Sequence, residues 1–167
     1  SYLQIFSEQL QIPVNQLKVV QGDTDLVEGH GSVGSRSLFV GGNAILRGIE
    51  DFLEECKQLA ASELEASVED LEYRQENFQV KGTRVGIGIF DLCSRQSDNS
   101  ISVKRKKELT GRSWPNGCHV AEVEIDVETG EVRLDRYVSV DDVGNTVNPM
   151  IVHGQVQGGI ASGLGQA

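Results

Sequence analysis

Apolar side chains recur at helical spacing in two stretches of the N-terminal half. Leu3, Phe6 and Leu10 are three and four residues apart and Pro13 follows them, so the sequence predicts a helix that ends before the proline. Further along, apolar residues again recur every three or four positions, at Ile45, Ile49, Phe52, Cys56 and Leu59. This pattern predicts a long amphipathic helix whose apolar face packs on a sheet.

Shorter segments between and after these helices predict further elements. A strand is expected from Leu17 to Val20, ending in a turn rich in Gly and Asp, and two short strands are expected around Gln75 to Asn77. The stretch from Arg84 to Arg95 is expected to be helical despite its two glycines. Helix and strand signals thus alternate along this half.

The C-terminal part predicts a β-hairpin followed by a helix. Alternating apolar residues place Val120, Val123 and Ile125 in one strand and Val132, Leu134 and Tyr137 in the next. The turn between them is Glu128, Thr129 and Gly130. Asn148 and Pro149 then open an apolar helix with regularly spaced glycines, since proline is favoured in the first turn of a helix.

Together these elements predict an α+β fold, a two-layer α/β sandwich with a mixed sheet and an antiparallel hairpin. The hairpin around Gly130 is antiparallel, whereas a crossover from Val20 through the long helix to the strands near Leu71 allows a parallel pair. Residues 97–114 interrupt the pattern, with little periodicity and a basic run from Lys104 to Lys107. We expect a mobile, solvated loop there.

Charge and cysteine usage narrow the function classes. Of the 167 residues, 15 are Lys or Arg and 25 are Asp or Glu, so the formal net charge is −10. Nucleic acids and anionic membranes require a basic face, and neither is an expected partner. Cys56, Cys93 and Cys118 lie far apart without CxxC spacing, so we expect packing or surface thiols, no metal ligands and a reduced, cytoplasmic protein.

The glycine-rich stretch GHGSVGSRS, residues 29–37, precedes the long helix directly. Backbone N–H groups converge where such a loop opens a helix, and the helix N-terminus carries partial positive charge, so the pattern indicates an anion site. Ser32, Ser35 and Ser37 add hydroxyl donors, and Arg36 adds a guanidinium suited to phosphate or carboxylate. No Gly-Lys-Ser/Thr follows, so it is not a P-loop, and the dinucleotide fingerprint is only partly met. A flexible loop without a ligand is the alternative.

Two blocks of sequence resemble a known family. GDTD, GHGSVGSRS and GGNAILRG form the first block, and WPNGCHVAEVEIDVETGEV with DVGNTVNPMIVHGQVQGGIASGLGQA forms the second. In this order they resemble the molybdenum-cofactor-binding region of the large subunit in the xanthine dehydrogenase, aldehyde oxidase and carbon monoxide dehydrogenase family. Residues 1–167 then represent a fragment of the C-terminal cofactor-binding region of such a subunit.

The resemblance implies a cofactor and partners. Family members bind molybdenum through a dithiolene-bearing pterin, often extended by a cytosine nucleotide in bacteria, and hydroxylate a small-molecule substrate with oxygen from water. Electrons leave through iron–sulfur clusters to FAD on other domains or subunits. By motif match, Gly34, Ser35, Arg36 and Ser37 lie beside this cofactor, and Gln155 contributes a second polar wall. The glutamate that serves as catalytic base is expected outside this chain, so the fragment itself is expected to be inactive.

The sequence also allows other interpretations of the loop. The same loop would suit a non-catalytic module that binds a phosphorylated ligand or a partner chain. Asp23 and Asp25 resemble a carboxylate pair, but they are expected to fix a turn by accepting backbone N–H groups. His30, His119 and His153 are expected to be surface or packing residues rather than ligands.

Overall fold

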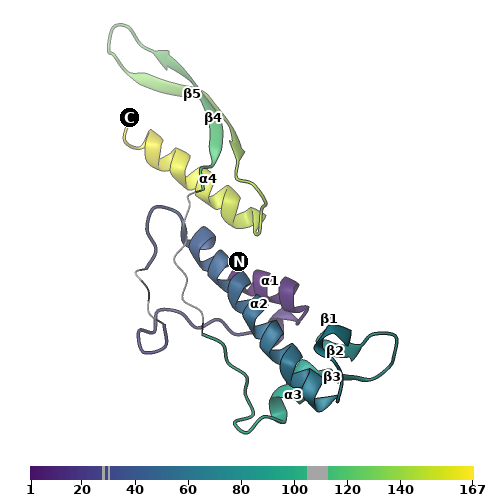
Figure 1. Cartoon of the computed structure of the whole chain (residues 1–167). Coiled ribbons are helices and arrows are strands. Elements are labelled where there is room, and N and C mark those ends of the chain that lie inside the picture. The colour runs from purple at the N-terminus through teal and green to yellow at the C-terminus, as the bar shows by residue number, and fades with distance from the viewer. Residues whose placement is uncertain (28, 30, 105–112) are drawn as a thin grey trace. The chain divides into compact units, whose positions relative to one another are not determined.

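The computed structural model describes residues 1–27, 29, 31–104 and 113–167. The chain divides into two compact units, Ser1–Thr110 and Gly111–Ala167 (Figure 1). Within the described residues, the first unit holds a three-stranded sheet and the second a two-stranded sheet. Each unit also contributes helices, so the predicted α+β class is confirmed.

Helices α1 and α2 of the first unit form where the sequence predicts them. Helix α1 stops before Pro13, where Gln11 adopts a left-handed conformation with φ of 53°. The long amphipathic helix becomes α2, which turns Ile49 and Cys56 into the interior. The helical elements are α1 (Tyr2–Leu10), η1 (Val14–Gln16), α2 (Ser37–Glu63), η2 (Val68–Asp70) and α3 (Ile89–Ser94).

The sheet of the first unit is antiparallel throughout, in the order β1-β2-β3. Its strands are β1 (Leu71–Arg74), β2 (Asn77–Val80) and β3 (Gly86–Gly88). The predicted pair around Gln75 to Asn77 is confirmed as a hairpin with a two-residue loop. Gln75 and Glu76 both have positive φ, 46° and 65°, which matches the right-handed twist of a tight hairpin.

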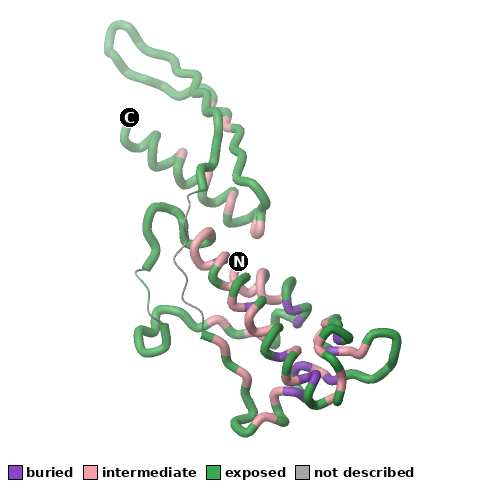
Figure 2. The backbone as a smooth tube through the Cα atoms, in the orientation of Figure 1, coloured by how far each residue is buried: buried purple, intermediate pink, exposed green. Residues whose placement is uncertain are grey.

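A continuous core holds the first unit together. Phe78, Leu71, Leu92 and Cys56 are the largest fully buried side chains, and they belong to one cluster with residues of α1, α2, α3 and all three strands. Figure 2 shows the buried positions in purple. The Tyr73 hydroxyl donates to the carbonyl oxygen of Leu10 at 2.6 Å and so ties α1 to the sheet. These long-range contacts position α1 and α2, whose first turns flank the glycine-rich loop.

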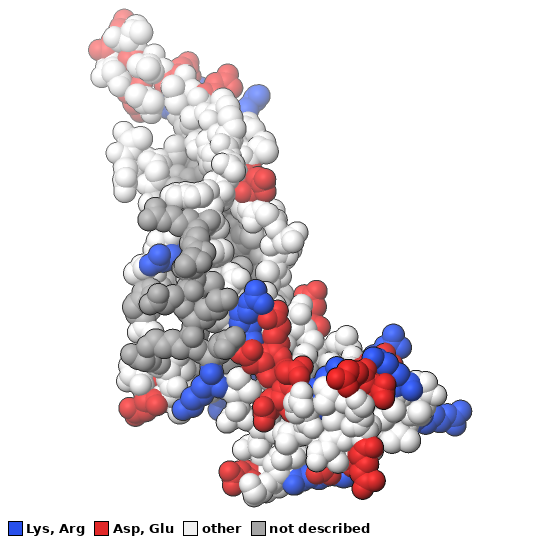
Figure 3. Space-filling view, in the orientation of Figure 1, with Lys and Arg blue, Asp and Glu red and all other residues white. Residues whose placement is uncertain are grey.

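The second unit is a long hairpin with one helix. β4 (Asn116–Ile125) pairs antiparallel with β5 (Val132–Asp142), and α4 (Pro149–Leu164) follows. As predicted, the turn centres on Gly130, and the Asp126 carboxylate accepts the backbone N–H groups of Glu128 and Thr129 at 2.8 and 3.1 Å. No Asp, Glu, Lys or Arg occurs in α4, and its surface in Figure 3 is white.

Three details of the sequence prediction are wrong. No mixed sheet forms among the described strands, because the segment from Leu17 to Val20 is not a strand and leaves no parallel partner for β1. This short segment is instead anchored by the side chain of Leu17, which packs against the core. The stretch from Arg84 to Arg95 is not one helix, since Gly86–Gly88 pair with β2 and only Ile89–Ser94 are helical. An added Cβ at Gly86 would lie 2.8 Å from the Phe78 carbonyl oxygen, so glycine permits this pairing.

The predicted mobile loop at 97–114 lies partly outside the described residues. Its described parts contain no helix or strand, and Ile101 packs against the core of the first unit. The basic run from Lys104 to Lys107 falls outside them except for Lys104. The mobility of this loop stays a prediction.

Candidate anion-binding loop at the start of helix α2

The glycine-rich loop turns directly into α2 through two consecutive left-handed residues. Gly34 and Ser35 have φ of 59° and 51°, Arg36 is the N-cap, and Ser37 is the first helical residue. Gly31 is also left-handed, with φ of 76°. A left-handed serine is uncommon and costs free energy, which is a feature of ligand-binding loops. The structure therefore brings Gly34, Ser35, Arg36 and Ser37 together at one helix N-terminus, as predicted.

Contacts from α1 hold the first turn of α2 in place. The Tyr2 hydroxyl donates to the carbonyl oxygen of Ser37 at 2.9 Å. It lies so close that a Cβ added at Gly41 would be 2.2 Å from the hydroxyl oxygen. The Ser32 and Ser37 hydroxyls form a hydrogen bond to each other across the loop. Glycine at 41 and these hydroxyls thus fix the entrance to the helix.

The N-terminus of α2 offers uncapped hydrogen-bond donors. The first intrahelical bond runs from the Val40 N–H to the Arg36 carbonyl oxygen at 2.8 Å, so the amides of residues 37–39 have no carbonyl partner within the helix. The Arg36 side chain does not cap them, and the first turn holds no acidic residue. Among the described residues, these amides are available to a ligand.

Arg36 adds positive charge where the helix already carries it. A helix N-terminus has a partial positive charge, and a cation beside it destabilises the helix unless an anion lies between them. Arg36 is exposed, and no ion pair among the described residues involves its guanidinium. Amides, serine hydroxyls and a guanidinium form a donor set that suits a phosphate or another oxygen-rich anion. This arrangement is the strongest candidate binding site in the first unit.

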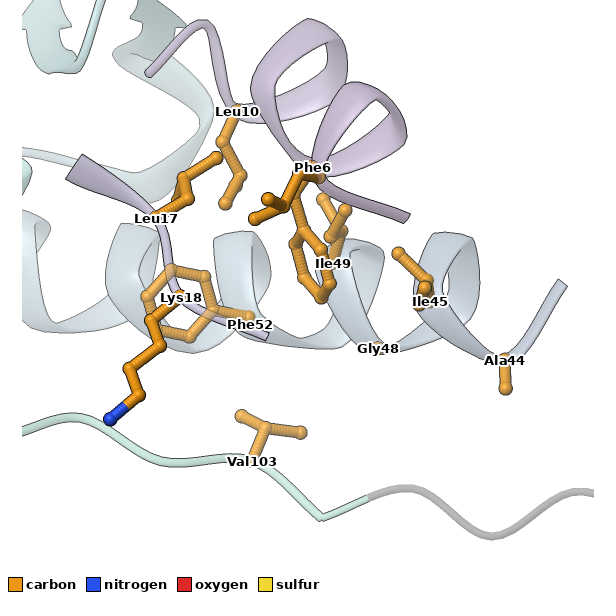
Figure 4. Close-up of a pocket in the computed structure, with 11 residues that line it drawn as sticks. Phe6, Leu10, Leu17, Lys18, Ala44, Ile45, Gly48, Ile49, Phe52 and Val103 are labelled. Carbon is orange, nitrogen blue, oxygen red and sulfur yellow. The ribbon is translucent and has the colours of Figure 1, made fainter. Parts of the chain in front are cut away.

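An apolar pocket of about 450 Å³ lies elsewhere in the first unit, between α1 and α2 (Figure 4). Phe6 and Leu10 from α1 face Ile49 and Phe52 from α2 across it, and Lys18 lies at one edge. None of the predicted loop residues lines this pocket. Its walls provide hydrophobic contact and few polar groups, so it differs in chemistry from the loop.

The remaining predicted residues are distributed over both units. Asp23 fixes its turn, because its carboxylate accepts the backbone N–H of Asp25 at 3.0 Å, as expected. Gln155 is exposed on α4, in the second unit, so its place in a common site with Arg36 stays a prediction. His153 is exposed on the same helix, and His30 lies outside the described residues.

His119 is the residue whose surroundings the sequence did not predict. Its Nδ1 lies 2.9 Å from the Tyr137 hydroxyl, and its Nε2 lies 3.0 Å from the Asp141 carboxylate. Strand register brings these side chains together, and only a shift in register near Glu122 and Val123 places Tyr137 on the same face as His119.

The described residues contain neither a cluster of metal ligands nor a membrane-spanning helix. No three His, Cys, Asp or Glu side chains among them lie close enough to hold a metal ion together. Nor does any helix in this part of the chain have the length and hydropathy needed to cross a bilayer.

The donor set of the loop and of the first turn of α2 is typical of a domain that binds an oxygen-rich anionic group. All 167 residues match the family model described as the molybdopterin cofactor-binding domain, and the chain belongs to this family. The donors around Gly34 and Arg36 fit this cofactor, because its pterin and phosphate present oxygen and nitrogen acceptors to amides and a guanidinium.

Curated relatives and solved structures agree with this assignment. The chain is 30% identical to subunit gamma of the 6-hydroxypseudooxynicotine dehydrogenase complex of Paenarthrobacter nicotinovorans, over 98% of its own length and 22% of the relative. It is also 30% identical to the carbon monoxide dehydrogenase large chain of Hydrogenophaga pseudoflava, over 100% of its length and 22% of the relative. The structure of quinoline 2-oxidoreductase from Pseudomonas putida 86 matches 99% of the chain and 22% of that protein, with 30% identity and a TM-score of 0.79. The chain thus spans about a fifth of the length of these relatives.

Proposed function

We propose that this chain is part of the molybdenum-cofactor-binding subunit of a molybdenum hydroxylase. The observation that carries the proposal is the N-terminus of α2, where uncapped amides and Arg36 meet without an anion among the described residues. A pterin cofactor with a phosphate supplies the missing negative charge. The loop therefore binds the organic part of the cofactor.

Each residue of the loop has a distinct task in this proposal. The left-handed Gly34 and Ser35 turn the chain so that the first amides of α2 face the cofactor. Arg36 donates charge-assisted hydrogen bonds to cofactor oxygens, and the Ser35 and Ser37 hydroxyls add neutral ones. Gln155 on α4 supplies a further polar contact. The bound cofactor supplies the redox chemistry that places a water-derived oxygen on the substrate.

The catalytic base lies outside this chain in our proposal. A base must reach within hydrogen-bond distance of the proton that it removes, in a site shielded from water. The one glutamate in a Gly-Glu step, Glu131, is exposed directly after the hairpin turn, with its backbone N–H bound to the Thr129 hydroxyl at 3.2 Å. Such a carboxylate serves no buried centre. The chain alone is accordingly a binding element without turnover.

The remaining features of the proposal follow the family. The substrate is an aldehyde, an N-heterocycle or carbon monoxide, and the pterin in a bacterial enzyme carries the cytosine nucleotide. Iron–sulfur clusters and FAD reside on partner domains or subunits, and the enzyme acts in the cytoplasm. The carbon monoxide dehydrogenase and quinoline oxidoreductase relatives support this range of substrates without selecting one.

Metal analysis of the natural protein that contains this chain tests the proposal. We expect molybdenum and pterin in a fixed ratio to protein, together with iron and flavin from the partners. A preparation without molybdenum or pterin, in which the loop still binds a phosphorylated ligand or a partner chain, would favour a non-catalytic module instead.

An activity assay tests the placement of the base. After attempted reconstitution with the sulfurated cofactor, the 167-residue chain is incubated with an artificial electron acceptor and purines, aldehydes or carbon monoxide. We expect no reduction above background. Turnover with any substrate would place the base within this chain, and Glu131→Gln would then be the first variant to examine.

A further inference from the structure

His119 connects two side chains of β5 from its position on β4. Its Nδ1 is 2.9 Å from the Tyr137 hydroxyl and its Nε2 is 3.0 Å from Asp141 Oδ1. The rings of His119 and Tyr137 also meet edge to face, with centroids 5.8 Å apart. Both ring nitrogens are therefore engaged, which leaves neither free to act as a base or a ligand.

Small residues make room for this cluster on the same face of the hairpin. In the register of β4 and β5, Gly117 lies opposite Asp141 and Ala121 lies opposite Tyr137. An added Cβ at Gly117 would be 2.7 Å from Asp141 Oδ1. The absence of a side chain at 117 thus lets the Asp141 carboxylate lie along the sheet toward the imidazole.

Helix α4 borders the cluster with two glycines and two larger apolar residues. His119 and Tyr137 line a pocket of about 150 Å³ together with Gly159, Gly163 and two apolar residues of α4, Ile160 and Leu164. A Cβ at either glycine would meet nothing within 4 Å. The two rings form the hairpin wall of this pocket, and the helix forms the other wall.

The tautomer of His119 follows from its partners. Ionised Asp141 only accepts hydrogen bonds, so Nε2 carries the proton and Nδ1 accepts from the Tyr137 hydroxyl. If the imidazole is protonated, Nδ1 donates to the same hydroxyl oxygen instead, and both contacts persist. The α4 residues that line the pocket contain no titratable group, so Asp141 and Tyr137 are the ionisable groups that face the ring.

We propose that His119 is a positioning residue. By binding Tyr137 and Asp141 at once, it fixes the hairpin wall that α4 borders, and so it sets the position of the helix that carries Gln155. Only the last step, from α4 to the cofactor, rests on the proposed function.

NMR on the 167-residue chain tests the first step, that the His119 cluster sets the position of α4. The variants are Asp141→Asn, which keeps the shape and removes the charge, and Tyr137→Phe, which removes the hydroxyl. In the wild type we expect the Nε2-protonated tautomer of His119 and nuclear Overhauser contacts between the Tyr137 ring and the Ile160 methyl groups. Asp141→Asn should abolish the tautomer preference. In both variants the nuclear Overhauser intensities between the aromatic ring at position 137 and the Ile160 methyl groups should fall at least threefold. The cross-strand nuclear Overhauser contacts at Ala121 should persist.

Two outcomes would overturn this step. Unchanged contacts to Ile160 in both variants would show that the cluster does not position α4. Loss of the cross-strand contacts would show that the cluster only maintains the hairpin.

The cofactor content of the holoenzyme tests the second step, that the position of α4 affects cofactor binding. We expect Asp141→Asn to lower the molybdenum content at least threefold, whereas His153→Gln, on the exposed surface of α4, keeps the wild-type content. Equal content in both variants would overturn the link from His119 to the cofactor. Absence of cofactor in the wild type would instead refute the proposed function and leave the NMR result standing.

Discussion

The two units differ in how they use similar apolar residues. In the described part of the chain, every buried hydrophobic side chain belongs to the first unit, where α2 and α3 cover three short strands. In the second unit Ile125, Val132 and Ile151 remain 56%, 61% and 46% exposed. Alternation along β4 and β5 produces an apolar face, yet one small helix does not cover it. A hydrophobic pattern thus predicts a strand, whereas a core also requires a second layer.

Helix α4 sharpens this contrast. It contains no Asp, Glu, Lys or Arg and has no pronounced polar face, and a helix without a polar face is normally buried on all sides. Here most of its residues are exposed. We therefore expect the first unit to account for most of the stability of the chain.

The largest expected effect follows from removing the centre of that core. Phe78 on β2 is fully buried in the core of the first unit, so Phe78→Ala should lower the free energy of unfolding of this unit by about 3–5 kcal/mol. Urea denaturation followed by region-resolved hydrogen exchange measures this loss. Val127→Ala, at a position 92% exposed, is the control and should change stability by less than about 0.5 kcal/mol. Equal losses would contradict the contrast between the units.

Most of the fold could be predicted because helices and hairpins leave local signals. The 3.6-residue spacing that ends at Leu59 predicted α2, and Gly130 predicted the long hairpin. The strand at Leu17 failed because strand formation depends on a partner elsewhere in the chain, which no local pattern reveals. Gly86 was assigned to a helix because the sequence does not show how closely the Phe78 carbonyl oxygen approaches it.

The candidate site was partly predictable for the same reason. Glycines and serines before a helix form a local signal, so Gly34 to Ser37 were placed correctly at the start of α2. His119 was missed because its partners depend on strand register. In a hairpin without a bulge, Tyr137 would lie on the face opposite to that of His119. The extra residue Asp135 on β5 shifts the register and brings both side chains to the same face. Sequence alone gives no sign of such a bulge.

A second prediction asks whether each unit contributes to cofactor binding. Arg36→Ala in the full-length enzyme removes a charge-assisted contact worth about 1.5–3 kcal/mol, so the cofactor content should fall markedly. Gln155→Leu on α4 removes a neutral contact worth about 0.5–1.5 kcal/mol and should have a smaller effect. Molybdenum per protein is measured together with the melting temperature of the apoprotein, which should change little for Arg36→Ala. Wild-type molybdenum content in Arg36→Ala would refute the role of the loop.

Alkaline pH provides a third test, since it acts on groups buried in the first unit. Burial raises the pKa of Cys56 from 9.0 to about 12, and burial raises that of Tyr73 from 10.0 to about 12. Above pH 9 the unfolded chain therefore binds fewer protons than the folded chain, and the free energy of unfolding falls as pH rises toward 12. Each group contributes at most about 1.4 kcal/mol per pH unit.

Cys56→Ala isolates the contribution of the thiol. Under reducing conditions, the free energy of unfolding of this variant should fall less than that of the wild type when the pH is raised from about 7.5 to about 10.5. Cys118→Ala, on the exposed strand β4, is the matched control and should keep the wild-type pH dependence. Identical pH dependence in Cys56→Ala and the wild type would show that the thiol does not stay neutral in the folded core.

The smallest effect is expected at the start of α4. The Asn148 side chain accepts the backbone N–H of Ile151 at 3.3 Å, and Pro149 occupies the first turn, where a missing N–H has no cost. Asn148→Ala should destabilise α4 by about 1 kcal/mol, whereas Asn148→Ser, which retains a capping oxygen, should lose much less. Amide hydrogen exchange at residues 151–154 reports this difference, because a helix without a core beneath it opens locally before the rest of the chain unfolds. Faster exchange spread equally over the first unit would mean that α4 and the core unfold together, and the contrast between the units would then fail.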